Sequence, residues 1–362
     1  MLEPDDNRKG TATKTSNPRW KQRPPGSTWG DFGPDDQLGR LSLLTPAKVL
    51  QGIAEVREGR AFCLSMPLDY PGGNVLNPRR HPPTLRPTER EGKPVMNYPL
   101  SRHDHRHTDI VCDDVVVITL QYSTQWDSLA HVGQMFDADG DGKAEMVFYN
   151  GYRAGEHIVG PVDYSGGGEK PVGAHRGARA LGVENMAKSC IQGRGVMIDL
   201  FAHYGRERKW VGYDALMHVL DKDKVVVESG DLVCLRTGFD DLILEQGKQP
   251  SGELLAKSCA VLDGRDEKLQ QFVTDSGLVA LISDNYAVEA HPSRDCDGPS
   301  CASLPLHAHC LFRLGVNLGE LWYLSELADW LRAHKRSRFL LTAPPLRLPG
   351  AVGSPATPVA TV

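Results

Sequence analysis

The sequence has no run of about 18 apolar residues, the length that a membrane-spanning helix needs. Its opening segment, Met1–Trp20, lacks the apolar core of a secretory signal peptide. Basic residues are not in excess, because 41 Lys and Arg face 46 Asp and Glu, for a net charge of -5. No Lys or Arg cluster alternates with aromatic residues, as a nucleic-acid groove would require. We therefore expect a cytoplasmic protein that binds a small-molecule substrate, with no nucleic acid and no membrane as partner.

Cysteine pairs with zinc-site spacing are also missing. The eight Cys residues are scattered and include no CxxC motif. Scattered cysteines in a cytoplasmic chain are usually reduced thiols. Only Cys296 and Cys301, which bracket the sequence DGPS, are placed to close a small loop.

The chain is long enough to bury a large core, with 362 residues of which 40% are hydrophobic. Residues 1–26 are polar and without period, which predicts a disordered extension. No linker interrupts the chain after this extension, so we predict one domain over residues 27–349. Residues 350–362 are expected to form a tail that packs on this domain or on a neighbouring subunit.

Short apolar runs bounded by turn residues predict buried strands. These runs are VVVITLQ (115–121), GRGVMIDLF (193–201), DLVCLRTGF (231–239) and LVALISDN (278–285). Helical spacing of apolar residues predicts helices in KVLQGIAEVREG (48–59) and ELWYLSELADWLRAHKR (320–336). The mixture indicates an α/β protein. Long segments rich in Gly, Pro and Arg, at 71–107 and 159–179, predict lids or binding loops.

The run TLQYSTQWDSLAHVG places polar side chains at the end of a predicted strand. If the strand includes Gln121 and Gln125, both lie on one face, and if a helix comes next, Asp127 and His131 are one turn apart. A straight strand would separate the two Gln residues by about 13 Å, so the four side chains converge only if the backbone bends near Thr124. The alternative is a polar corner, in which Asp127 caps the helix and His131 bonds to the backbone.

The same run resembles the motif H-x-G-T-H-x-D-x-P-x-H of the cyclase family that includes bacterial kynurenine formamidase and isatin hydrolase. The Thr, Asp and last His of the motif match Thr124, Asp127 and His131, whereas Gln121 and Gln125 replace its first two His residues. Further segments resemble longer members of the family, and the resemblance covers almost all of residues 27–360. They are STWGDFGPDDQLGRLSLLTP, YNGY, GDLVCLRTGF, SDNYAVEAHP, LPLHAHCLFRLGVNLGELW and FLLTAPPLRLPGAVGSPATPVA.

The resemblance implies a single domain of mixed sheets with flanking helices, the swivelling β/β/α fold, in a homodimer or higher homo-oligomer. It implies a hydrolase of a small cyclic or aromatic amide, imide, formamide or lactone, or the reverse ring closure. It also implies a divalent metal such as Zn, Mn or Mg. Asp127 and His131 match metal ligands of the family. Glu320 and either His307 or His309 match a later pair of ligands.

The two Gln replacements leave the use of a metal open. An amide oxygen is a harder ligand than imidazole and suits Mn or Mg better than Zn. One alternative is a metal site that includes Gln121, Gln125, Asp127, His131 and Glu320 and activates water, with a nearby His as the acid. A second alternative is a metal-free cyclase or lactonase, in which Asp127 and His131 form the acid–base pair and Gln N–H groups hold the oxyanion. A third is an inert small-molecule-binding homologue, against which the retention of Asp127 and His131 argues.

Other residues are candidates with structural alternatives. Thr124 and Trp126 lie within the motif, and Arg236 and Glu289 follow apolar strands where polar groups commonly face a pocket, so all four are candidates for substrate binding. A structural salt bridge is the alternative for Arg236 and Glu289. Core packing is the alternative for the two later His residues, and a favourable helix start for Glu320.

Two further motifs suggest metal binding but fit it poorly. DADGDGKAE imitates the start of an EF-hand, but Phe148 stands where the bidentate Glu is needed, so we predict a solvated turn. HDHRH, residues 103–107, shows no ligand spacing and is interpreted as an exposed loop near the site mouth.

Overall fold

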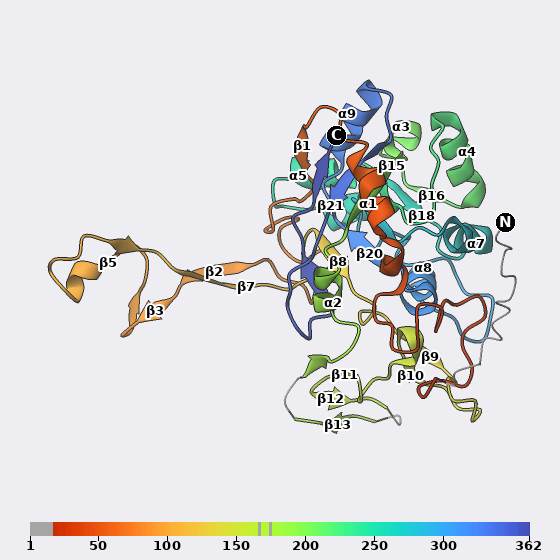
Figure 1. The fold of residues 1–362 in the computed structure, drawn as a ribbon, viewed down its shortest axis with the longest axis horizontal. Coiled ribbons are helices and arrows are strands. Elements are labelled where there is room, and N and C mark those ends of the chain that lie inside the picture. Colours follow the sequence, from red (N-terminus) through yellow and green to blue (C-terminus); the bar gives the residue numbers. More distant parts are fainter. Residues whose placement is uncertain (1–16, 166–167, 174–175) are drawn as a thin grey trace, which may run out of the picture.

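A mixed sheet lies at the centre of the computed structural model, which describes residues 17–165, 168–173 and 176–362 (Figure 1). Within these residues the sheet has nine strands, in the order β1-β23-β21-β15-β17-β19-β20-β8-β22. The strands are β1 (Ala61–Cys63), β23 (Val359–Thr361), β21 (Arg338–Thr342), β15 (Gln192–Asp199), β17 (Leu232–Arg236), β19 (Ala280–Ser283), β20 (Asn317–Glu320), β8 (Gln125–Asp127) and β22 (Gly353–Pro355). Neighbours from β15 to β20 are parallel, and the outer pairs are antiparallel.

Helices flank this sheet, which confirms the expected α/β class with mixed sheet and flanking helices (Figure 1). The α-helices are α1 (Pro46–Ile53), α2 (Val183–Lys188), α3 (Phe201–Tyr204), α4 (Tyr213–Asp223), α5 (Phe239–Glu245), α6 (Gly252–Ala256), α7 (Glu267–Ser276), α8 (Pro305–His307) and α9 (Ser325–Ala333). A π-helix, η4 (Ala308–Leu314), continues directly from α8, and short 3-10 turns occur at η1 (Gly39–Leu43), η2 (Leu100–Arg102) and η3 (Tyr149–Gly151). Among the described residues, no helix has the length and apolar character needed to cross a membrane.

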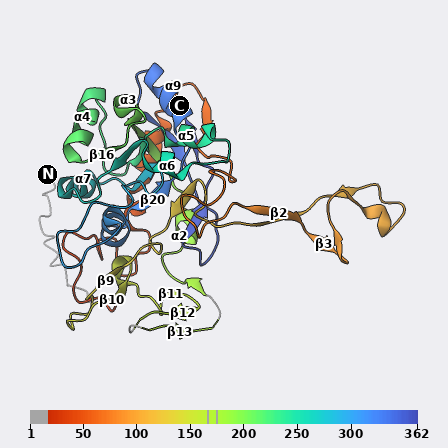
Figure 2. The ribbon, with the colours of Figure 1, turned by 180° about the vertical axis from the view of Figure 1, so that it is seen from behind.

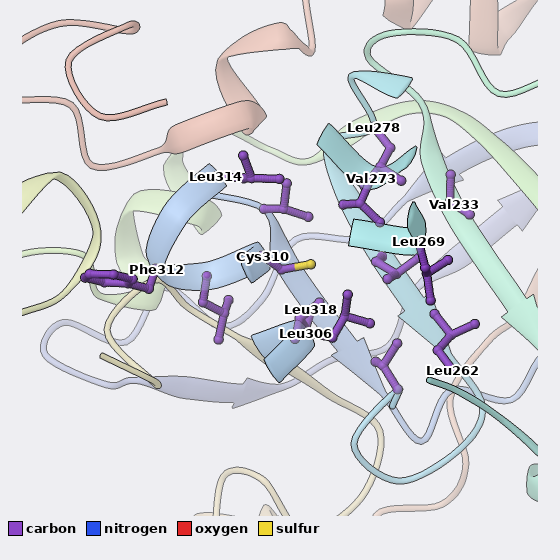
Figure 3. Close-up of a cluster of buried hydrophobic side chains, with 14 of the residues drawn as sticks. Val233, Leu262, Leu269, Val273, Leu278, Leu306, Cys310, Phe312, Leu314 and Leu318 are labelled. Atoms are coloured by element: carbon purple, nitrogen blue, oxygen red, sulfur yellow. The ribbon is translucent and has the colours of Figure 1, made fainter. Parts of the chain in front are cut away.

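The parallel strands are buried on both faces, which explains why they appear in the sequence as nearly continuous apolar runs. Along β17, Val233 packs into one apolar cluster, whereas Leu232 and Cys234 pack into the cluster on the opposite face. Figure 3 shows part of the first cluster, where Val233 lies with residues of α7 and η4, including Leu269 and Cys310. The three predicted strands at 193–201, 231–239 and 278–285 are confirmed as β15, β17 and β19.

The fourth predicted strand, at 115–121, is not a buried strand. Its first residues form β7 (Asp114–Val117), which pairs with β2 (Thr84–Pro87) in a two-stranded ribbon that extends far from the body (Figures 1 and 2). Val116 and Val117 are 50% and 66% exposed, because no described layer covers the ribbon. We call residues 81–118 the arm. Its outer part pairs β3 (Glu89–Arg90) with β4 (Lys93–Pro94), and β5 (Tyr98–Pro99) with β6 (Ile110–Val111).

The remaining hairpins and pairs are short. They are β9 (Gln134–Phe136) with β10 (Glu145–Val147), β11 (Ile158–Val159) with β14 (Gly177–Ala178), β12 (Val162–Asp163) with β13 (Lys170–Pro171), and β16 (Lys209–Val211) with β18 (Ala260–Leu262). The predicted loop at 71–107 thus contributes mostly to the arm, and the described part of 159–179 forms hairpins.

Both predicted helices are shorter in the structure. The helix expected over 48–59 ends at Ile53, because the chain then turns so that Glu58 and Gly59 donate backbone hydrogen bonds to the carbonyl of Val362. The helix expected over 320–336 begins only at Ser325, because residues up to Glu320 belong to β20. The C-terminal tail supplies β22 and β23 to the central sheet.

Two expectations concern the chain outside this sheet. The predicted disordered extension falls mostly on residues 1–16, outside the described residues, but residues 17–26 contact the body. Lys21 and Gln22, for example, donate backbone hydrogen bonds to the carbonyl of Ala138. Cys296 and Cys301, the one pair placed to close a loop, are joined in a disulfide.

Candidate metal and catalytic site

The motif residues lie on a strand rather than on a strand-to-helix corner. Gln125–Asp127 form β8, which pairs with β20 on one side and β22 on the other. Both neighbouring strands form hydrogen bonds with the backbone of β8, so these residues have no need of a helix. The chain after Asp127 makes only a turn, in which His131 N donates to Ser128 O. Alternation along the strand places Gln125 and Asp127 on one face and Trp126 on the other. The predicted helix, and with it the helix-capping alternative for Asp127, is therefore wrong.

Asp127 is fully buried, and neither of its carboxylate oxygens has a hydrogen-bond partner among the described residues. Burial raises the pKa of this carboxyl, against the lowering effect of the nearby His131 charge. An ionised carboxylate that is buried without partners is unfavourable, because the energy of its lost hydration is not replaced. The position therefore favours either a proton or a bound cation.

His307, at the end of α8, is held in one orientation by a second buried carboxylate. Its Nδ1 lies 2.8 Å from Oε1 of Glu289, and the backbone N–H groups of Leu306 and His307 also donate to Glu289, each at 2.9 Å. With Nδ1–H donated to Glu289, Nε2 is directed at the carboxylates of the site. It lies 3.2 Å from Glu320 Oε1 and 4.0 Å from Asp127 Oδ2. Burial lowers the pKa of His307, but the hydrogen bonds to Glu289 and Glu320 outweigh it and raise this pKa to about 10.

Gln125 and Glu320 complete the buried cluster. Gln125 Nε2 donates to Glu320 Oε2 at 2.9 Å, whereas Gln125 Oε1 is buried without a partner. Burial raises the pKa of Glu320, but the hydrogen bond and positive charge of His307 outweigh it, so the net direction is downward. The oxygen of Gln125 is thus free to act as a ligand, whereas its amide nitrogen is engaged.

His131 is the solvent-facing member of the group. Its Nε2 lies 3.7 Å from Asp127 Oδ1, and its side chain is 21% exposed. A proton on this imidazole can exchange with water while the ring stays beside the buried carboxylate.

Ligand atoms of Asp127, His307 and Glu320 lie within 4.8 Å of one another, so these residues form a potential metal site. The unpartnered oxygens of Asp127 and Gln125 fit a cation, because both residues offer buried acceptors without a hydrogen-bond partner among the described residues. A second described group, Asp137, Asp139 and Asp141, also meets this distance criterion. Its carboxylates mainly accept backbone N–H groups of the exposed turn itself, as the solvated-turn interpretation predicts.

The structure distinguishes between the two later histidines. His307 belongs to the cluster, whereas His309 Nε2 bonds to Thr274 Oγ1 at 2.9 Å. Burial, aided by the positive charge of Arg313, lowers the pKa of His309 to about 4. His309 is therefore not placed as a catalytic residue.

Three of the four residues expected to bind substrate have side chains that form hydrogen bonds or ion pairs within the protein. Thr124 Oγ1 donates to the carbonyl of Leu321 at 2.6 Å, and Trp126 Nε1 donates to the carbonyl of Ala343 at 2.8 Å. Arg236 forms ion pairs with Asp329 at 2.8 Å and Asp199 at 3.5 Å. The fourth, Glu289, reaches the site only through His307. The Gln121 side chain lies against Gly353, whose partner in the β22–β8 pair is Asp127, so Gln121 lies on the Asp127 side of the sheet.

Sequence reasoning missed Arg80 and the small pocket that it lines. Arg80 Nη1 donates to the carbonyl of Gln121 at 2.8 Å. The pocket, of about 10 Å³, is bordered by Arg80, Gln121, Tyr122, Tyr286 and Leu321 among others. Its only signal in the sequence is the Arg-rich character of residues 71–107.

Comparison with known proteins identifies relatives of this chain. The family described as putative cyclase matches residues 62–290. A solved structure described as a novel cyclase is 27% identical, with 93% of this chain and 99% of that chain covered and a TM-score of 0.67. No curated protein matches the sequence.

Two isatin hydrolases share the fold at lower identity. Isatin hydrolase A from Ralstonia solanacearum is 14% identical with a TM-score of 0.53, and isatin hydrolase A from Labrenzia aggregata, bound to benzyl benzoate, is 13% identical with a TM-score of 0.51. Each alignment covers 87% of this chain and 97% of the other.

Proposed function

This chain belongs to the putative cyclase family, and from that premise we propose that it is a hydrolase that uses a divalent metal. Its proposed substrate is a small cyclic or aromatic amide, imide, formamide or lactone, and the same site would serve the reverse ring closure. One observation carries the proposal. The buried Asp127 carboxylate has no hydrogen-bond partner among the described residues and faces His307 Nε2 and Glu320.

The residues that would hold the ion are Asp127, His307 and Glu320, with Gln125 Oε1 as a further oxygen. Three of these four residues offer oxygen, and oxygen-rich sites suit Mn²⁺ or Mg²⁺ better than Zn²⁺. Glu289 fixes the tautomer of His307, as carboxylates commonly do for histidine ligands. When bound, a divalent ion lowers the pKa of water and polarises a carbonyl group.

His131 is the residue placed to move protons. Its Nε2 is 3.7 Å from Asp127, and its partial exposure keeps it open to substrate and solvent. It would take a proton from the attacking water as the oxygen adds to the carbonyl carbon. It would then give that proton to the leaving nitrogen or oxygen as the ring or amide bond breaks, which leaves a carboxylic acid and an amine or alcohol.

The metal-free alternative has less support. It needs Gln amide N–H groups to stabilise the oxyanion, but Gln125 Nε2 already donates to Glu320. A protein that only binds small molecules would not require the pairing of Glu289 with His307.

A reconstitution assay tests the proposed function. Protein stripped with a chelator would be assayed with Mn²⁺, Mg²⁺ or Zn²⁺ against isatin, phthalimide, an N-formyl aniline and an aromatic lactone. We expect turnover of at least one substrate only after metal is restored, and a loss of roughly 100-fold or more in kcat for His131→Gln. His218→Gln, at an exposed position on α4, is the matched control and should retain full activity. Equal activity with and without metal would contradict the metal mechanism, and full activity of His131→Gln would remove its assigned role.

A further inference from the structure

A pocket lies at the base of the arm, directly beside the candidate metal site. Its border includes Leu321, the residue after Glu320, and Gln121 from the motif. Tyr122 and Tyr286 supply aromatic walls. Both hydroxyls are tied to the surrounding chain, because Tyr122 donates to the carbonyl of Gly73 at 2.9 Å and Tyr286 accepts from Asn77 Nδ2 at 3.3 Å. The pocket therefore has fixed walls, and its volume of about 10 Å³ admits one small polar group but no ring.

Arg80 is the cation of this pocket. Its Nη1 donates to the carbonyl of Gln121 at 2.8 Å, and its guanidinium carbon lies 5.8 Å from the centre of the Tyr286 ring. A guanidinium carries five N–H donors, and the side chain of Arg80 uses only this one in hydrogen bonds to the described residues. The contact with Gln121 fixes the side chain and leaves the rest of its donors for a ligand.

Arg80 forms no ion pair with any described carboxylate, unlike two arginines of the central sheet. Arg194, for comparison, is paired with Asp231 at 2.8 Å, and Arg236 with Asp329 at 2.8 Å. The charge of Arg80 nevertheless acts on the site, since it contributes to lowering the pKa of Asp127 and of Glu320. Arg80 thus stands near both carboxylates of the cluster without contacting either one.

An unpaired guanidinium with free parallel donors beside an aromatic wall has the geometry that recognises a carboxylate. Resting on the proposed function, which places the scissile carbonyl at the Asp127 cluster, we propose that Arg80 forms an anion subsite. The substrate is then a planar ring compound that carries a carboxylate group beside its cleavable amide, imide or lactone. The carboxylate accepts two N–H bonds from Arg80 at this pocket, and the ring stays outside it, toward the Asp127 cluster.

Equilibrium binding tests this subsite without turnover. The probes are phthalimide-4-carboxylate and neutral phthalimide, added to the Mn²⁺-loaded protein and, separately, to protein without metal. We expect the wild type to bind the carboxylate probe at least about tenfold more tightly than the neutral one, as one charged hydrogen-bonding contact would provide. Arg80→Met should abolish this preference and leave the neutral probe unaffected. Arg80→Lys should restore it only in part, because Lys lacks the planar fork.

Arg86→Met, at an exposed position on the arm, is the matched control and should behave as the wild type. Circular dichroism would confirm that each variant is folded. Equal weakening of both probes in Arg80→Met would overturn the proposal, because Arg80 would then act on pocket structure and not on the carboxylate. An unchanged preference in Arg80→Met would overturn it as well. A carboxylate preference that depends on Arg80 in protein that hydrolyses no substrate would uphold the subsite while the proposed function fails.

Discussion

Replacing Glu289 by Gln should weaken both the fold and the metal site, because this carboxylate accepts three hydrogen bonds in the interior. Oε1 accepts from Nδ1 and from the backbone N–H of His307, and Oε2 accepts from the backbone N–H of Leu306. In the Gln variant the amide oxygen can keep the two bonds of Oε1 in neutral form, whereas the amide nitrogen cannot accept from Leu306. A buried donor left without an acceptor costs about 1–3 kcal/mol, so we expect a loss of roughly 2 kcal/mol in the free energy of unfolding.

The same change should lower metal affinity. Glu289 holds His307 so that Nε2 is directed at Glu320 and Asp127, and loss of such a partner typically reduces metal affinity about 10–100-fold. Chemical denaturation of metal-free protein would give the stability, and calorimetric titration with Mn²⁺ would give the affinity. Glu253→Gln, which breaks the exposed pair with Lys257, is the control and should cost less than about 1 kcal/mol without changing affinity. A folded Glu289→Gln protein that binds Mn²⁺ as tightly as the wild type would refute the orienting role.

Three further predictions concern other parts of the molecule. Purified protein should contain less than one zinc per chain, and Gln121→His/Gln125→His should raise its zinc affinity, because both side chains lie on the Asp127 face. A zinc content of the parent that elemental analysis finds to be already one-to-one would contradict this. Because the pKa of His309 is lowered in the folded protein, the unfolded chain binds a proton on this residue at higher pH than the folded chain does. The free energy of unfolding should therefore fall as pH drops from about 6.5 toward 4. A His309→Gln variant should show a shallower decline in melting temperature over that range. The homo-oligomer implied by the family resemblance stays a prediction, and light scattering that finds only monomer at micromolar concentration would exclude it.

The central strands were predictable because burial on both faces leaves a direct trace in the sequence. Residues of β15, β17 and β19 alternate between two apolar clusters, so nearly every position is apolar. The run VVVITLQ has the same composition, yet its Val residues lie on the exposed arm. Composition alone does not show whether another layer covers a strand, and here none of the described layers does.

The site was predictable only in part, because its members are brought together by distant pairing. Asp127 and His131 were found from the motif, but β8 was mistaken for the approach to a helix. Its partners β20 and β22 follow about 190 and 226 residues later in the chain, and local spacing carries no signal of them. His307 and His309 are equivalent by spacing, and only the position of Glu289 separates them.

For Arg80 the sequence offered only the Arg-rich character of residues 71–107. This residue reaches the pocket because the two ends of the arm are paired strands, so that Arg80 before the arm contacts Gln121 after it, 41 positions later. Such a contact depends on the path of the whole arm, which the propensities of single segments do not determine.

Binding of Mn²⁺ followed by electron paramagnetic resonance, in the wild type and in Asp127→Asn, tests the central claim most directly. Asn keeps the size of the side chain but removes the unpartnered charge that favours a cation at this position. The control is Asp139→Asn, in the exposed acidic turn. We predict one tightly bound ion per chain in the wild type and in Asp139→Asn, and a large loss of affinity in Asp127→Asn. Unchanged binding in folded Asp127→Asn, or loss of the ion in Asp139→Asn instead, would contradict the assignment of the metal site to Asp127, His307 and Glu320.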